Sequence, residues 1–114
     1  ADINPSGDAA KGYSVDSDYI LLDQQGKSYR VYGSTNNYRL MVYKTGINLT
    51  LDNASITVSG YNNPLDLVGE TDTILTLAGS SSLTNSAGTA RIYGYSACLT
   101  IRGSGSLECF AIYA

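Results

Sequence analysis

The sequence of 114 residues contains no histidine and no tryptophan, and it has only one methionine and one phenylalanine. Histidine is the usual general base near neutral pH and a frequent metal ligand, so its absence excludes many designs of catalytic and zinc sites. The sequence also lacks a G-x-S-x-G motif, a glycine-rich phosphate loop and a pair of carboxylates on one predicted face. We therefore expect a protein that is not an enzyme and has no cofactor.

Clustered basic residues and long apolar runs are absent as well. The seven Lys and Arg residues are scattered and the net charge is −3, whereas nucleic-acid backbones are bound by grouped cations. No apolar run reaches the length of about 18 residues that a membrane helix needs, and the first residues lack the basic-then-apolar pattern of a secretion signal. We expect no nucleic-acid partner, no membrane insertion, and a mature protein that is secreted or displayed on the cell surface.

The two cysteines are too few for a disulfide scaffold and have no histidine or further cysteine beside them to complete a metal site. Because side chains alternate between the faces of a strand, Cys109 is predicted to point inward and Cys98 outward. A bond between them is therefore disfavoured. Cys109 is expected to pack as a small apolar side chain, and Cys98 to be free or paired with another chain.

A repeated pattern dominates what the sequence does contain. The stretches NLTLDNASI (48–56), ILTLAGSSSL (74–83) and CLTIRGSGSL (98–107) share one pattern, and Leu49, Leu75 and Leu99 recur at a nearly constant interval. Such a period is typical of stacked repeats, whereas a β-sandwich, the alternative for many short strands, has no reason to repeat. The sequence predicts a right-handed parallel β-helix, or β-solenoid, of about four coils of roughly 24–26 residues, each with three strands.

The predicted strands recur in a fixed order. The first strands are 40–42, 65–67 and 90–92, the second are 49–51, 75–77 and 99–101, and the third are 56–58, 83–85 and 107–109. Tyr29 and Val31 are assigned to a third strand of the preceding coil. Outward ladders of Thr50, Thr76 and Thr100 and of Ser55, Ser82 and Ser106 follow from this alignment. Threonine is common on exposed strand faces, so ice binding by the first ladder is a minor alternative.

Ten tyrosines point to a contact surface, because tyrosine combines a large apolar ring with a polar tip. On the first predicted face, aromatic and cationic side chains surround the outward residues Met41 and Asp66. A flat patch of this kind can stack on sugar rings or contact another protein. The candidate carbohydrate-binding residues are Arg39, Tyr43, Arg91, Tyr93 and Tyr95.

The segments GKSYRVYGSTNNYRLMV, INLTLDNASIT and PLDLVGETDTILTLAGSSSLTNSAG carry a family resemblance over Lys27 to Leu107. This region resembles the repeats of bacterial surface proteins classed as carbohydrate-binding parallel β-helices, a family with a clostridial cellulose- and pectin-binding member. The resemblance implies an architecture similar to pectate lyases and an association with calcium and acidic polysaccharides. The sequence departs from that pattern at the calcium site, since Asp52 and Asp66 are predicted on different faces and no other aspartate cluster is present.

The two ends of the chain suggest a second function. Residues 1–12 read as a flexible arm and residues 13–114 as one domain, with no cap evident at its C-terminal end. Open strand edges recruit other chains, so the alternative to a polysaccharide or glycan partner is a structural subunit that stacks head-to-tail into an extracellular filament. The residues expected at this assembly edge are Ile20, Leu22, Leu107, Phe110 and Ile112.

Overall fold

The computed structural model describes residues 2–3, 14–16, 19–22, 24–36, 38–94, 96–109 and 111–113, the first two segments by their backbone alone. These residues form two β-sheets and no helix. The seven-stranded sheet, called the curled sheet here, contains β1 (Asp2–Ile3), β4 (Ser28–Thr35), β6 (Ile47–Val58), β8 (Asp72–Ala78), β9 (Ser80–Asn85), β11 (Cys98–Arg102) and β12 (Ser106–Glu108). The second sheet contains β2 (Ser14–Asp16), β3 (Tyr19–Leu22), β5 (Arg39–Val42), β7 (Leu65–Leu67), β10 (Arg91–Tyr93) and β13 (Ala111–Tyr113).

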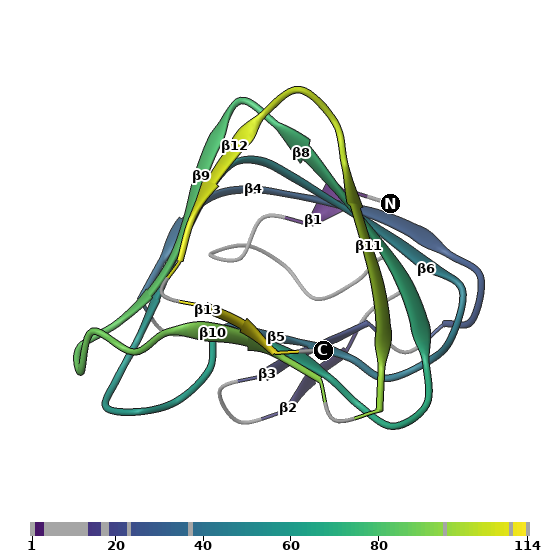
Figure 1. Cartoon of the computed structure of the whole chain (residues 1–114), viewed down its shortest axis with the longest axis horizontal. Coiled ribbons are helices and arrows are strands. Elements are labelled where there is room, and N and C mark those ends of the chain that lie inside the picture. Colours follow the sequence, from purple (N-terminus) through teal and green to yellow (C-terminus); the bar gives the residue numbers. More distant parts are fainter. Residues whose placement is uncertain are drawn as a thin grey trace.

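The chain alternates between the two sheets, so that neighbouring strands in each sheet come from successive repeats. All strand pairs are parallel except β2 with β3. The curled sheet bends like half of a barrel, and the second sheet closes the open side beneath it (Figure 1). No described helix is long and apolar enough to cross a membrane.

The bend of the curled sheet is built from residues with a left-handed backbone. β6 passes through the bend without a break, pairing with β8 before it and with β9 after it. Asn53 at this point has a φ of 49°, and Gly33, Gly79 and Gly103 occupy the bend in the neighbouring repeats with φ of 85°, 67° and 102°. The Asn53 side chain also accepts a hydrogen bond from the Ser80 amide at 3.1 Å, which ties two adjacent repeats together at the bend.

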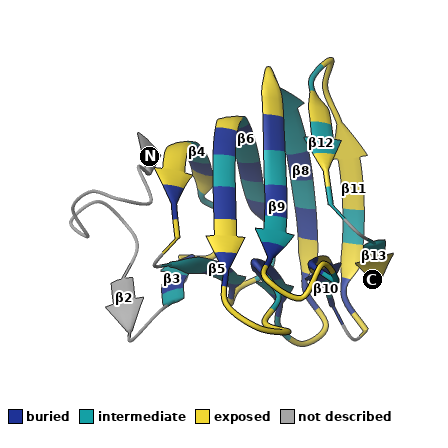
Figure 2. Cartoon of the chain, turned by 90° about the vertical axis from the view of Figure 1, so that its left-hand side faces the viewer, coloured by how far each residue is buried: buried dark blue, intermediate teal, exposed yellow. Residues whose placement is uncertain are grey.

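The core lies between the two sheets and is made by the alternating inward residues of each strand. β6 shows this pattern clearly, because buried and more exposed residues alternate along most of its length. Figure 2 shows the same alternation on the neighbouring strands. The fully buried aliphatic side chains come from both sheets; they include Leu22, Leu40, Leu49, Leu51, Ile56, Leu65, Leu75, Leu83 and Ile92.

The prediction of a right-handed parallel β-helix with three strands per coil is wrong. The described strands form two sheets rather than three faces, one of them curled, and the arrangement is closer to a sheet sandwich. The predicted second and third strands belong to a single sheet because left-handed residues bend the backbone between them without ending the pairing, as β6 shows. The antiparallel pair of β2 and β3 is a further departure from an all-parallel coil.

The alignment of the third repeat is also corrected. Leu49 pairs with Leu75 as expected, but Leu75 pairs with Ile101, and Leu99 lies beside Thr73. The repeat at this point is therefore as long as the one before it and not shorter. The predicted register of this strand was wrong by two positions. Such a shift leaves every side chain on its correct face, so the alternation of inward and outward residues could not reveal it.

The corrected register of the third repeat also changes the two predicted outward ladders of threonine and serine. Thr50 and Thr76 are neighbours, but the next residue in their row is Arg102, and Thr100 lies beside Ile74. Ser55 likewise pairs with Ser82, while Ser106 pairs with Ser80.

Tyr29 and Val31 belong to the second-strand position rather than the third. They pair with Leu49 and Leu51, so this first repeat is clearly shorter than the repeats that follow it. Repeat length therefore varies along the molecule, which the assumption of a nearly constant period missed.

Candidate functional site

The outer face of the second sheet gathers aromatic and charged side chains from all its parallel strands. One row runs across the sheet in register, from Leu21 to Met41, Asp66, Tyr93 and Tyr113. The predicted neighbours Met41, Asp66 and Tyr93 are thus side by side. We call the following residues the aromatic face: Tyr19, Arg39, Asp66, Arg91, Tyr93 and Tyr113.

A pair of stacked rings lies at one end of this face. The ring centroids of Tyr93 and Tyr113 are 5.3 Å apart with an angle of 26° between the planes. The Arg91 guanidinium lies 5.7 Å from the centroid of the Tyr93 ring, and Arg91 is exposed. Tyr113 is 52% exposed. The stack therefore offers an apolar surface to solvent with a cation beside it.

The Arg39 side chain is fixed in place by its neighbours. Its guanidinium lies 4.0 Å from the centroid of the Tyr19 ring and donates a hydrogen bond to the Tyr19 hydroxyl. Arg39 also donates to the Asn62 side chain at 3.4 Å and lies 3.9 Å from an Asp66 carboxylate oxygen. Because only 14% of its side chain is exposed, Arg39 orients this part of the face more than it offers a free charge.

Asp66 is a half-buried carboxylate on the aromatic face. Burial raises its pKa above the ordinary value, and this effect outweighs the opposite influences of the Arg39 charge and of a hydrogen bond from Asn63. A carboxyl group in this position can accept or donate hydrogen bonds, depending on pH, to a polar ligand on the sheet.

The remaining predicted carbohydrate-binding residues lie further along the strands or outside the described residues. Tyr43 directly follows β5 and is 50% exposed, with the Lys44 ammonium 5.8 Å from its ring centroid. Tyr95 lies outside the described residues.

Sequence reasoning missed Tyr19 and Tyr113 as members of this face. Each lies one short repeat away from its neighbour in the adjacent strand, Arg39 and Tyr93 respectively. A search for aromatic residues at a shorter repeat length than the one assumed would have found both.

The outer face of the curled sheet is more polar. Arg30 forms an ion pair of 3.0 Å with Asp52 and lies 4.6 Å from the centroid of the Tyr32 ring. Hydroxyl groups from adjacent repeats hydrogen-bond each other across the strands, as in the Thr57–Thr84 pair at 2.9 Å. These hydrogen bonds use part of the hydrogen-bonding capacity of the hydroxyl groups on this face.

The C-terminal end of the molecule differs from the rest. Within the described residues, β11 pairs only with β8, β12 only with β9, and β13 only with β10. We call these three strands the open end; they are the yellow strands nearest the viewer in Figure 1 and lie at the right in Figure 2.

Residues of the predicted assembly edge divide between the two ends. Leu107 and Ile112 belong to the open end, where Leu107 is half-buried and Ile112 is 47% exposed. Ile20 and Leu22, by contrast, are buried core residues of β3, which is paired on both sides. Phe110 lies outside the described residues.

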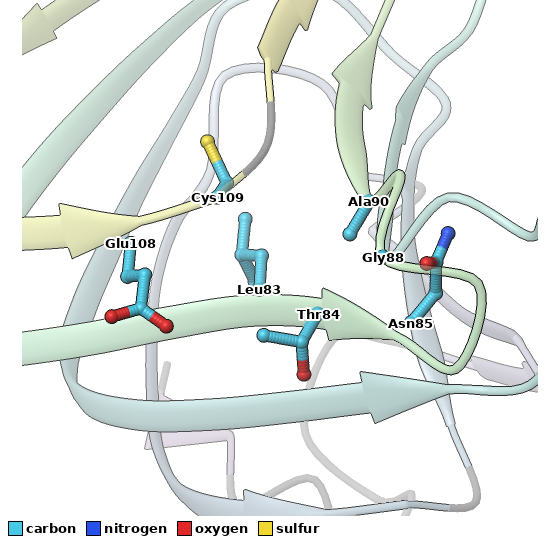
Figure 3. A pocket seen from close by; sticks show the side chains of 7 residues that line it. All are labelled: Leu83, Thr84, Asn85, Gly88, Ala90, Glu108 and Cys109. Carbon is cyan, nitrogen blue, oxygen red and sulfur yellow. The ribbon is translucent and has the colours of Figure 1, made fainter.

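A small pocket of about 270 Å³ marks the open end (Figure 3). It forms because β12 pairs with β9 only as far as Ser82, which leaves the last residues of β9 without a described strand on that side. The pocket residues are Leu83, Thr84, Asn85, Gly88, Ala90, Glu108 and Cys109. Burial raises the pKa of the Cys109 thiol and so disfavours the reactive thiolate.

The two cysteines are free thiols, Cys98 exposed and Cys109 half-buried against the core. The described residues contain no group of three or more His, Cys, Asp or Glu side chains able to hold a metal ion. No family model matches the sequence, and comparisons with curated proteins and with solved structures give no match. Function must therefore be inferred from the residues of the site.

Proposed function

We propose that this chain is a non-catalytic, secreted or cell-surface domain that binds a polysaccharide or glycan on the aromatic face. The observation that carries the proposal is the stack of the half-buried Tyr93 on the exposed Tyr113, with Arg91 beside it. The C–H groups of a pyranose ring are apolar and pack on an aromatic face, while its hydroxyls need polar neighbours. The sequence resemblance to bacterial surface carbohydrate-binding proteins points to the same class of ligand.

The arrangement of the face fits an extended ligand. Parallel strands lie about 4.8 Å apart, so the row from Met41 through Asp66 and Tyr93 to Tyr113 extends over roughly 15 Å, the length of about three sugar units. Asp66, which lies 3.9 Å from Arg39, is directly beside Tyr93 in this row, and the ring stack follows it. Hydrogen bonds with the Asp66 carboxyl group would complement ring stacking on the neighbouring tyrosines.

Affinity electrophoresis in gels that contain soluble polysaccharides tests the proposal, with neutral and acidic polymers in separate gels. We expect at least one polymer to retard the native chain. A Tyr93→Ala, Arg91→Ala variant should lose most of that retardation, because it removes one ring of the stack and its cation. Retention by the acidic polymer alone would narrow the ligand to uronate-containing chains.

Tyr32→Ala is the matched control, because Tyr32 also lies beside an arginine but on the curled sheet. It should migrate like the native chain. Circular dichroism must show that both variants are folded. Equal retardation of the native chain and the folded Tyr93→Ala, Arg91→Ala variant, or no retardation in any gel, would contradict the proposal.

Stacking into a filament is the second candidate function. It is favoured by the open end, where three strands lack a second described partner. Head-to-tail stacking needs a complementary edge at the other end of the molecule. There β1 pairs with β4 and β2 pairs with β3, and neither has a second described partner, so a filament would form by pairing at the outer edges of β1 and β2.

A further inference from the structure

A β-turn between β6 and β7 carries a highly exposed aromatic side chain. The Asn62 amide donates a hydrogen bond to the Ser59 carbonyl at 3.3 Å, which closes the turn, and Gly60 at its second position has a φ of 61°. Tyr61 at the third position is 81% exposed, compared with 52% for Tyr113 of the aromatic face. Because this ring buries little of its surface, it contributes little to the stability of the core.

The backbone of the turn is fixed by hydrogen bonds to the following repeat. The Gly60 amide donates to the Ser86 hydroxyl at 2.6 Å, and the Gly60 carbonyl accepts from the Ala87 amide at 3.2 Å. The Asn85 side chain donates to the Asn62 carbonyl at 3.1 Å. The exposed ring is therefore carried by a backbone that is already ordered, so a ligand that contacts the ring need not order the turn.

The turn adjoins the aromatic face. Its Asn62 side chain accepts a hydrogen bond from Arg39 at 3.4 Å, and the next residue, Asn63, hydrogen-bonds the Asp66 carboxyl group. Asp66 belongs to β7, which is paired on both sides, with β5 and with β10. The segment that follows β6 extends beyond the second sheet on the side away from the curled sheet (Figures 1 and 2). The turn therefore forms a raised border beside Asp66, in the middle of the sheet.

We propose that the ligand of the aromatic face is a single glycan chain that passes beside this turn and contacts Tyr61, rather than the flat surface of a crystalline polymer. This inference rests on the proposed function and narrows its ligand class. A crystalline surface is planar and rigid, so the raised turn would hold it away from Asp66 and Tyr93. A single chain can bend beside the turn, stack on Tyr93 and place another sugar unit against Tyr61.

Two binding measurements test the ligand class. Affinity electrophoresis uses the soluble polymers hydroxyethyl cellulose, xylan and polygalacturonate, and sedimentation uses microcrystalline cellulose and crystalline chitin. We expect at least one soluble polymer to retard the native chain, and the native chain to stay in the supernatant with both crystalline polymers. A native chain that is retarded in the gels and also sediments with a crystalline polymer would overturn this inference but not the proposed function.

Substitutions of Tyr61 test its contact with the ligand. Tyr61→Ala should weaken binding to the retarding polymer about fivefold or more, because it removes the exposed ring, whereas Tyr61→Phe keeps the ring and should bind within about twofold of the native chain. Circular dichroism should show both variants folded, since the position is 81% exposed. Equal binding by the native chain and Tyr61→Ala, in gels where Tyr93→Ala, Arg91→Ala loses binding, would overturn this inference alone. No retardation of the native chain in any gel would contradict both proposals.

Tyr61→Trp gives a direct signal of contact, since the native sequence contains no tryptophan. The indole at this exposed position should shift its fluorescence emission to shorter wavelength when the retarding soluble polymer is added, because the sugar displaces water from the ring. The midpoint of this shift should match the affinity measured in the gels. Unchanged emission from a Tyr61→Trp variant that the same gel retards would contradict the contact.

Discussion

The two ends of the molecule are built from the same kind of strand but differ in how their core residues are protected. At the N-terminal end Ile20, Leu22 and Val31 are almost completely buried. At the C-terminal end Ile101 and Ile112, which occupy equivalent inward positions, are 42% and 47% exposed. The difference shows that burial here is conferred by a neighbouring strand rather than by the type of side chain.

This comparison has an energetic consequence. An inward apolar residue without a covering strand leaves hydrocarbon in contact with water, at a cost of about 25 cal/mol for each Å². This cost applies to Ile101 and Ile112, whereas the inward residues Ile20 and Val31 at the N-terminal end are covered.

The largest loss of folding stability is expected for a buried residue in the middle of an inward row, and a smaller loss for the exposed residue at the end of the same row. Leu75→Ala should lower the free energy of unfolding by about 2–5 kcal/mol, because Leu75 is fully buried between two repeats. Ile101 lies in the same row. Ile101→Ala should lower the free energy of unfolding by less than about half of that amount, since the Ile101 side chain is already 42% exposed. Urea unfolding followed by circular dichroism measures both. Equal losses would mean that the end is as well protected as the middle.

A smaller loss in the free energy of unfolding is expected for a substitution at the bend between β11 and β12. Gly103 has a φ of 102°, and a Cβ atom added there would meet the backbone of Leu77. Gly103→Ala should therefore cost about 2–3 kcal/mol. Gly60→Ala is the matched control, because Gly60 also has a positive φ, of 61°, but has nothing within 4 Å of the added atom. It should cost about 1 kcal/mol. A larger loss from Gly60→Ala than from Gly103→Ala would contradict this account of the bend.

The smallest effect concerns pH and the aromatic face. Since its pKa is raised in the folded chain, Asp66 binds more protons when folded than when unfolded, and its contribution to stability falls as pH rises from the ordinary value of 3.8 through the higher folded value. Asp66→Asn removes this dependence. The unfolding free energy of the native chain minus that of the variant should therefore decrease over this window and stay constant above it. An increase with pH would mean that pairing with Arg39 outweighs burial.

Part of the fold could be predicted from the sequence, because alternation decides which side of a strand faces the core. Leu49 and Leu75 were correctly predicted as inward neighbours, and Met41, Asp66 and Tyr93 as an outward row. Register in the third repeat could not be decided, since Leu99 and Ile101 point to the same side and lie only two positions apart. The number of sheets depended on whether the bend interrupts the pairing, which residue type alone does not reveal.

The candidate site was predicted in part for the same reason. Arg39, Arg91 and Tyr93 were found because they lie within repeats of similar length. Tyr19 and Tyr113 were missed because the repeats that place them are shorter than the others, and the aromatic face is incomplete without them. The roles of all these residues in carbohydrate binding stay predictions.

Hydrogen exchange measured by mass spectrometry tests most directly whether a strand is protected by having a paired strand on both sides. Peptides covering residues 98–113 should exchange faster than those covering residues 47–58, because the former contain strands with a single described partner and β6 is paired on both sides. Equal protection of the two segments, or faster exchange in residues 47–58, would contradict the account.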